Sequence, residues 1–563
     1  MSGRHRPTRL LRNRAIRTPL VVIGALSLIA AGSVILRTVT ADAGGCSSSS
    51  GIKLAVAADP AIAPAISEIA TAWGATRPTV NDECVRVEVV AKASHQMAEN
   101  LATWSGGWVD VAAKPAPTPA ESDLPPAWIP DSSYWIGRVS EVDRELFEGD
   151  GTSIAASPIV LAVPESVARA MAGQLPQGRL DTATISKLAL DPNNKNPLKI
   201  GMVEPRRDTA GMVGAMVISD AVVAAPKDLP RLVLSYRNVG ALVNDVQALW
   251  ESFGRGITGA PVSEQAVLAY NTSNTASPMA AVPLTDVPTL DYPFILRSRQ
   301  SRAITAAAAA FRGALTSQQY RNVLARHKLR LPDGSAAPGF PTGHGVTTAL
   351  VHVQPLQDMA RVASALRIWV AARTPSRVLA MVDATASMNN PLGARTRMQV
   401  MREAASQGLA LFTDVSEIGL WAYAGPGHQE LAPLAPLNKP GQRETLLAKV
   451  NAANPAPTDV TPLYASIKAG YQELLNNYKP ELRNTLVVFT DGRDNTGTGL
   501  RQTQRELEVL ADVTRYIRVV LLGIGPDVNM NELKAIADTT GGAAFQVNSP
   551  EEMQLIFLQA LLT

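Results

Sequence analysis

Short apolar runs alternate with amphipathic stretches along most of the chain from residue 51 onward. Apolar runs bounded by turn-forming residues predict strands, and apolar positions three and four residues apart predict helices. In the first half, the predicted strands span 52–58, 85–91, 109–113, 157–164, 198–204, 265–270 and 290–296. The predicted helices there span 61–73, 95–103 and 212–225, followed by a helix pair within 302–327. This alternation favours an α/β architecture with parallel strands.

The alternation is clearer over 376–563, which we predict to be a separate domain. Its predicted strands span 378–382, 417–423, 485–490, 517–524 and 543–547, and its predicted helices span 396–412, 443–450, 463–476, 502–513, 531–538 and 551–562. The strand predicted at 517–524 is almost continuously apolar, as expected for a central parallel strand. Between the two halves we predict a linker over 333–375. It begins with a Gly- and Pro-rich stretch and includes a bridging strand at 351–355 and a helix at 360–372.

The first 51 residues have a different character. Residues 1–18 contain six arginines and no acid, and residues 19–36 contain no charged side chain. The uncharged run is about the minimum length of a membrane-spanning helix, and the basic residues before it predict a cytoplasmic N-terminus. We therefore predict a basic tail (1–18), a transmembrane signal anchor (19–36) and a stalk (37–51). The alternative is a signal peptide cleaved near Ala41-Asp42-Ala43. Under either hypothesis the bulk of the chain is extracytoplasmic, and the anchor predicts a single-pass protein of the cell membrane.

Charge and cysteine content refine this picture. The formal net charge of +3 is smaller than the charge of the six tail arginines, so the rest of the chain is mildly acidic. That balance argues against a nucleic-acid partner. In an oxidising compartment the two cysteines, Cys46 and Cys84, predict a disulfide, with two free thiols as the alternative.

Five oxygen-bearing side chains stand just after predicted strands or at a predicted helix start. They are Asp383, Thr385, Ser387, Thr461 and Asp491. Ligands of an open parallel sheet gather at the carboxyl ends of its strands, so segments far apart in sequence can meet there. Two carboxylates and three hydroxyls suit a hard divalent cation, which prefers oxygen ligands.

The segments Asp383-Ala-Thr385-Ala-Ser387, Thr461 and Asp491-Gly492 resemble the metal-ion-dependent adhesion site of the von Willebrand factor type A (VWA) domain. That family carries an Asp-x-Ser-x-Ser motif, a distant Thr, and an Asp followed by Gly. Thr385 replaces the first Ser but keeps its hydroxyl. The resemblance covers 376–563 and implies a Rossmann-like fold that binds Mg²⁺ or Mn²⁺. It also implies an open coordination position that accepts a carboxylate from a partner protein.

Residues 52–332 resemble, more diffusely, a two-lobed extracellular solute-binding protein of the periplasmic binding class. The resemblance is carried by Lys53-Leu54-Ala55-Val56-Ala57-Ala58, Val109-Asp110-Val111, 157–164, Val203-Glu204-Pro205, Thr209-Ala210-Gly211 and Asp291-Tyr292-Pro293. It implies lobes joined by crossing strands, with a small-molecule ligand in the cleft between them. The residues that it would place there are Asp59, Ser157, Thr209, Ala210 and Gly211. The helix start at Thr209 is expected to receive an anion, with Arg206 and Arg207 nearby.

The sequence thus predicts a membrane-anchored extracytoplasmic binding protein that works in cell adhesion or assembly through its metal site. The alternative is a solute-binding receptor for transport or sensing through the first domain. No phosphate-binding loop or nucleophile elbow is present in the sequence, so we do not predict an enzyme.

Overall fold

The computed structural model describes residues 51–107, 117–175, 178–190, 198–223, 228–492, 494–512 and 514–549, together with Glu552 and Ile556. The predicted tail, membrane segment and Cys46 lie outside these residues. So do nearly all of the stalk, the strand predicted at 109–113 and most of the helix predicted at 551–562. Among the described residues no helix is both long and apolar enough to cross a membrane. The signal anchor and the disulfide therefore stay predictions.

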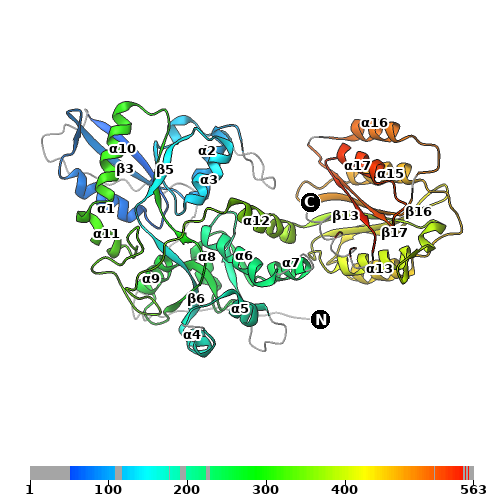
Figure 1. Cartoon of the computed structure of the whole chain (residues 1–563), viewed down its shortest axis with the longest axis horizontal. Helices are drawn as coiled ribbons and strands as arrows, with labels where there is room; N and C mark the ends of the chain where they lie inside the picture. Colours follow the sequence, from blue (N-terminus) through cyan, green and yellow to red (C-terminus); the bar gives the residue numbers. More distant parts are fainter. Residues whose placement is uncertain are drawn as a thin grey trace, which may run out of the picture.

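The first domain has two lobes, and the chain runs from them through α12 into the second domain (Figure 1). The first lobe is built on a six-stranded sheet in the order β2-β3-β1-β4-β12-β5. Strand β1 is parallel to β3 and β4, whereas β12 is antiparallel to β4 and β5. The elements of this lobe are β1 (Ile52–Ala58), α1 (Ala63–Gly74), β2 (Thr79–Val80), β3 (Glu83–Ala91), α2 (Ser94–Trp104), β4 (Ala127–Ile129), α3 (Ser133–Val142), β5 (Phe147–Ser153), β12 (Pro293–Arg297), α10 (Arg302–Leu315) and α11 (Arg321–Arg326).

The second lobe is organised around β6, which pairs antiparallel with β9, β10 and β11. The chain enters this lobe between β5 and β6 and leaves it between β11 and β12, so two crossing segments join the lobes. The elements of this lobe are β6 (Ser157–Pro164), α4 (Glu165–Met171), α5 (Thr182–Ile185), β7 (Gly201–Val203), α6 (Thr209–Val222), α7 (Leu229–Arg237), β8 (Ala241–Val243), α8 (Val246–Ser252), β9 (Ala260–Ser263), α9 (Glu264–Ser273), β10 (Met279–Pro283) and β11 (Thr289–Leu290).

Two predicted strands of this region are wrong. The segment 265–270 belongs to helix α9, because Ser263 caps it by accepting a hydrogen bond from the Ala266 N–H (3.1 Å). Its apolar run was too short for periodicity to separate strand from helix. The segment 351–355 has no strand pairing, and two backbone hydrogen bonds hold it, from Thr289 to the Gln354 carbonyl (2.8 Å) and from Val351 to the Gly334 carbonyl (3.3 Å).

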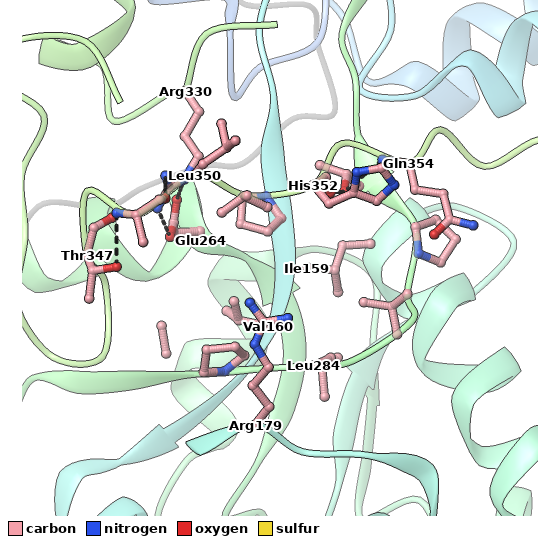
Figure 2. A pocket seen from close by; sticks show the side chains of 18 of the residues that line it. Ile159, Val160, Arg179, Glu264, Leu284, Arg330, Thr347, Leu350, His352 and Gln354 are labelled. Carbon is pink, nitrogen blue, oxygen red and sulfur yellow. Dashed lines mark hydrogen bonds and ion pairs between the residues drawn. The ribbon is translucent and has the colours of Figure 1, made fainter. Parts of the chain in front are cut away.

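Part of the predicted linker lies against the second lobe. Arg330 pairs with Glu264 through two hydrogen bonds of 2.7 and 2.9 Å, and it donates to the carbonyls of Thr347 (2.7 Å) and Ala349 (2.8 Å). These contacts close one side of a pocket of about 310 Å³, and Arg179 lines another side (Figure 2). A buried ion pair therefore fixes this stretch of linker to the first domain.

Helix α12 (Met359–Arg373), which ends the predicted linker, also packs on the second lobe. Trp369 is buried against the Tyr236 ring at a centroid distance of 5.1 Å, and its indole N–H donates to Glu204 Oε1 (3.1 Å). The helix contacts α6 and α7 and leads directly into the first strand of the second domain (Figure 1). The first domain thus includes α12 in its packing.

The second domain is a doubly wound α/β sheet in the order β17-β16-β13-β18-β19-β20. Strands β16, β13, β18, β19 and β20 are parallel to one another, and β17 runs antiparallel to β16 at the edge of the sheet. Its elements are β13 (Ser376–Asp383), β14 (Pro391–Leu392), β15 (Arg395–Thr396), α13 (Arg397–Leu409), β16 (Glu417–Ala424), β17 (Gly427–Pro436), α14 (Gln442–Ala452), α15 (Leu463–Asn476), β18 (Arg483–Thr490), α16 (Leu500–Leu510), β19 (Arg518–Ile524), α17 (Met530–Thr539) and β20 (Ala543–Val547).

Alternate residues of β13 face opposite layers of helices. Val378 and Val382 belong to the core shared with α13 and α14, and Leu379 and Met381 belong to the core shared with α15, α16 and α17. Two-sided burial explains why this strand is apolar at nearly every position. The mixed α/β fold predicted for both domains is confirmed.

Candidate metal centre

Four of the five predicted metal ligands meet at the carboxyl ends of the two central strands. Asp383 ends β13, and Asp491 follows β18, its neighbour in the sheet. The Thr385 hydroxyl donates to Asp383 Oδ1 (2.6 Å) and lies 3.0 Å from the Ser387 hydroxyl, which donates to Asp491 Oδ1 (2.8 Å). Each hydroxyl donates its single proton to one carboxylate, so the two hydroxyl oxygens lie 3.0 Å apart with no proton between them.

Thr461 lies on the loop beside this chain. That loop is held against the first motif, because Ala386 donates its N–H to the Thr458 carbonyl (2.8 Å). Thr461 is buried, and its hydroxyl donates to the Asp459 carbonyl (3.3 Å) and to none of the other four predicted ligands. A hydroxyl that donates its proton in this way keeps its oxygen lone pairs for a cation.

The electrostatics of Asp383 favour a bound cation. The side chain is fully buried, and burial together with the nearby charge of Asp491 raises its pKa to about 6, although hydrogen bonds from Thr385 and Thr490 oppose the shift. Two buried carboxylates this close repel each other unless a positive charge lies between them. Because the two carboxylates and the two hydroxyls brought together here offer only oxygen atoms, these residues fit a hard divalent cation.

The structure adds Arg397, which sequence analysis missed. Arg397 begins α13, and its guanidinium is buried while it donates to Asp491 Oδ2 (2.9 Å) and to the exposed Asp527 (2.7 Å). It stands 94 residues before Asp491, and no motif links the two positions. Arg397 offsets one of the two buried negative charges, so a divalent cation would leave the site with excess positive charge. Such a site attracts an external carboxylate.

Two residues that follow Asp491 were also missed. Asp494 caps helix α15 by accepting a hydrogen bond from the Tyr464 N–H (3.0 Å). Asn495 accepts one from the Thr461 N–H (2.8 Å). This loop therefore fixes the position of Thr461 relative to the end of β18. The run Asp494-Asn495 was the available clue, since both residue types are common helix caps and turn formers.

In the first domain, Asp59 and Thr209 are joined by a hydrogen-bond network that spans the two lobes. Asp59 Oδ2 accepts from the Ser94 hydroxyl (2.7 Å), and the same hydroxyl accepts from the Asp131 N–H (2.9 Å). The Trp135 indole N–H lies 2.8 Å from Asp131 Oδ1 and 3.0 Å from the Thr209 hydroxyl. Asp59 and Thr209 are thus parts of one buried polar network between the lobes.

The other predicted ligand-binding residues have different surroundings. Ser157 lies in β6, where its hydroxyl accepts from the Gln265 N–H (3.0 Å) at the start of α9. Ala210 and Gly211 form the first turn of α6, and the Gly211 N–H donates to the Asp208 carboxylate (2.7 Å).

This arrangement conflicts with the anion expected at the start of α6. The Asp208 carboxylate already occupies that helix terminus and repels a second negative charge. The two arginines expected to help are engaged elsewhere: Arg206 pairs with Glu204 (3.0 Å), and Arg207 donates to Asn244 (3.4 Å).

Comparisons with known proteins agree with this architecture. The model of the bacterial extracellular solute-binding protein family matches residues 54–329, and the model of the VWA domain matches residues 378–559. An uncharacterized protein of Mycobacterium tuberculosis (strain ATCC 25618 / H37Rv) is 25% identical over 528 residues, which cover 87% of this chain and 73% of the relative.

Solved structures with similar folds match each domain separately. A VWA protein from Catenulispora acidiphila is 20% identical with a TM-score of 0.29, over 34% of this chain and 42% of that one. A periplasmic thiamin binding protein is 11% identical with a TM-score of 0.40, over 57% of this chain and 95% of that one. The family models thus assign residues 54–329 to a bacterial extracellular solute-binding domain and residues 378–559 to a von Willebrand factor type A domain.

Proposed function

We propose that the VWA domain binds Mg²⁺ or Mn²⁺ and, through the open position of that ion, a carboxylate of a partner protein. The observation that carries this proposal is the approach of the Thr385 and Ser387 hydroxyl oxygens (3.0 Å), each of which donates to one of the carboxylates of Asp383 and Asp491. It places two buried carboxylates and two hydroxyls together at the carboxyl ends of the two central strands, with Thr461 on the adjoining loop. The ion would supply a strong positive charge at that point, and the protein side chains would hold and orient it.

The proposed setting is the outer side of a cell membrane. The uncharged run 19–36 behind an arginine-rich tail supports a single-pass anchor. An anchored module with a metal-dependent carboxylate site suits adhesion or assembly of surface proteins. We further propose that the protein binds rather than catalyses, since solute-binding and VWA domains are typically binding domains.

Calorimetric titration of the full chain in detergent with MgCl₂ tests the metal site. We expect saturable binding to the wild type and loss of that binding in Asp383→Asn, which keeps the shape of the side chain but removes its charge. Asp538→Asn, at an exposed position on α17, is the matched control and should bind as the wild type does. Equal Mg²⁺ binding by the wild type and Asp383→Asn would refute the metal site.

The partner step needs its own experiment. Crosslinking on intact membranes should give a product that disappears with chelator, returns with Mg²⁺, and is absent in Asp383→Asn. A product that survives both chelator and this substitution would show that the partner docks elsewhere on the chain.

A second candidate function is a solute-binding receptor that works through the first domain. The polar network from Asp59 to Thr209 favours it, because it places buried polar groups between two lobes that could enclose a ligand. This function predicts a bound small molecule and a permease or signalling partner.

A further inference from the structure

The polar network between the lobes contains an unusual concentration of acids, which we call the interlobe cluster. Its members are Asp59, Asp131, Asp208, Asp291 and Tyr292. They come from four places in the chain: the ends of β1 and β4, the start of α6, and the crossing segment between β11 and β12. Both lobes and the connection between them therefore supply acids to one region, in which Asp131 and Asp291 are buried and Asp59 and Asp208 are half-buried.

The carboxylates of this cluster are hydrogen-bonded to neutral donors. Asp59 accepts from the Ala61 N–H and from Ser94, and Asp291 accepts from the Ser133 N–H (2.8 Å). Asp131 accepts from the Trp135 indole. Neutral donors satisfy the oxygens but leave the charge uncompensated, and uncompensated buried charge is costly.

Burial and mutual repulsion both act on the pKa values of the cluster. Burial, followed by the charges of Asp59 and Asp208, raises the pKa of Asp131 well above its usual value. Burial and the charge of Asp59 likewise raise the pKa of Asp208 to about 6, against the hydrogen bond from Gly211. Carboxylates of the two lobes therefore sense one another across the interlobe region.

Tyr292 gives an independent indication of a missing partner. Its side chain is fully buried, and within the part of the chain that the structure describes its hydroxyl has no hydrogen-bond partner. After burial, the charges that act on this hydroxyl are those of the four cluster aspartates, which raise its pKa well above the usual value. A buried phenol without a partner, set among acids, marks a place that a polar ligand would fill.

We propose that the interlobe cluster binds an organic cation whose ammonium group lies between Asp59 and Asp131 of the first lobe and Asp208 of the second. The Tyr292 hydroxyl accepts one of its N–H donors or contacts the charged group directly. The indole of Trp135 and the imidazole of His95, whose ring centroids lie 6.5 Å apart, provide an aromatic side to the site. Cations are attracted to such rings.

An ammonium group fits better than a bare metal ion. Among the described residues, the interlobe acids do not form a group of three that could hold a metal, whereas the metal centre of the second domain adds hydroxyl oxygens to its two carboxylates. The acids come from four segments and keep their own hydrogen bonds, which suits a cation that carries several N–H donors. Burial and the nearby Arg207 lower the pKa of His95 to about 4, so this ring is neutral at physiological pH and adds no competing charge.

This inference rests on the receptor function and names its ligand class. The test uses the full chain in detergent at constant ionic strength, with putrescine, spermidine, choline, arginine, MgCl₂ and sodium sulfate as probes. We expect at least one amine probe to raise the Tm and to bind saturably in calorimetry. Asp131→Asn and Asp208→Asn should each weaken that binding at least tenfold.

Two further variants separate ligand binding from folding. Asp245 caps α8 in the same lobe through Ala248 (2.8 Å) but is exposed, so Asp245→Asn is the matched control and should bind as the wild type does. Tyr292→Phe removes only the partnerless hydroxyl. It should leave the Tm of the unliganded protein unchanged or higher while weakening amine binding several-fold.

The outcomes distinguish the ligand class from the receptor function. A shift with sulfate alone would overturn the cation proposal and leave the receptor function standing. A Mg²⁺ shift that persists in Asp383→Asn and disappears in Asp208→Asn would replace the ammonium group by a metal ion. No shift with any probe would overturn both the ligand class and the receptor function.

Discussion

Arg397 and Asp491 form a buried ion pair at the edge of the proposed metal site, with Arg397 Nη1 2.9 Å from Asp491 Oδ2. The other oxygen of the same carboxylate accepts from Ser387. One oxygen of Asp491 therefore pairs with the Arg397 guanidinium, and the other belongs to the proposed metal site. The Thr396–Gln399 capping box at the start of α13 holds Arg397 in this position.

Replacing Arg397 with Met should make the protein depend more strongly on the metal ion. Removing one partner of a buried ion pair typically costs about 3–5 kcal/mol, so we expect the metal-free Tm to fall clearly. The site also becomes one unit more negative, and Mg²⁺ should then raise the Tm by more than it does in the wild type. Thermal unfolding with EDTA and with saturating Mg²⁺ measures both effects.

Arg395→Met controls for the loss of an arginine in this region. Arg395 pairs with Glu403 at the surface (2.8 Å), and both side chains are about half exposed, so its loss should change neither Tm nor the Mg²⁺ increment measurably. If Arg397→Met instead abolishes the Mg²⁺ increment, Arg397 serves chiefly to position Asp491, and the charge argument is wrong.

Thr385 should be replaceable by Ser but not by Val. Its hydroxyl contacts both Asp383 and Ser387. Thr385→Ser keeps that oxygen and should bind Mg²⁺ within a few-fold of the wild type. Thr385→Val keeps the shape but removes the oxygen, and we expect a loss of at least about tenfold, as for other groups that orient metal ligands. Calorimetric Kd values for the two variants decide the matter, and equal affinities would exclude Thr385 from the site.

The sequence predicted the elements that are buried on two faces better than those at edges. Strands β1 and β6 and helix α15 have the predicted bounds, because continuous apolar runs or clear helical periodicity defined them. Strand β20 also has its predicted bounds, although it ends its sheet and is mostly half-buried. Strand β17 was missed entirely. It lies at the edge of its sheet, is half polar, and contains two prolines, which edge strands tolerate and which hide the strand pattern.

The same distinction applies to the proposed sites. The metal-ligand motifs are local, so Asp383, Thr385 and Ser387 could be found from spacing alone. Arg397 and Tyr292 could not, because their importance comes from partners 94 residues away or from a lack of partners, which only packing reveals. The cleft prediction named Asp59 and Thr209, which the structure joins in one hydrogen-bond network, but it did not consider Asp208, whose carboxylate caps the helix where an anion was expected.

Arg330 should hold the segment 344–354 against the first domain. Its guanidinium joins Glu264 to the carbonyls of Thr347 and Ala349, and it is almost fully buried. Arg330→Met should leave Glu264 as an unpaired buried charge, at a cost of about 3–5 kcal/mol. It should also open the segment to proteases, and limited proteolysis with mass spectrometry would locate the new cuts.

Arg326→Met is the surface counterpart for this prediction. Arg326 pairs with Glu68, and its side chain is more than half exposed, so its loss should cost at most about 1 kcal/mol and create no new cleavage site. Cleavage at the same rate in both arginine variants would show that the segment is held by other contacts.

The interlobe cluster predicts that the unliganded protein loses stability as the pH rises. The pKa of Asp208 is about 6 in the folded chain against a usual 3.8, so its carboxylate form is disfavoured by folding. Its contribution is fully present below about pH 4 and is lost as the pH passes through 6. Asp208→Asn removes the charge and keeps a capping oxygen. This variant should match the wild type near pH 4 and exceed it at pH 8 by up to about 3 kcal/mol, less whatever solvent screening removes. Urea unfolding across this range, with Asp245→Asn as the exposed-cap control, measures the difference. A difference in stability that is the same at all pH values would mean that folding does not shift the pKa of Asp208.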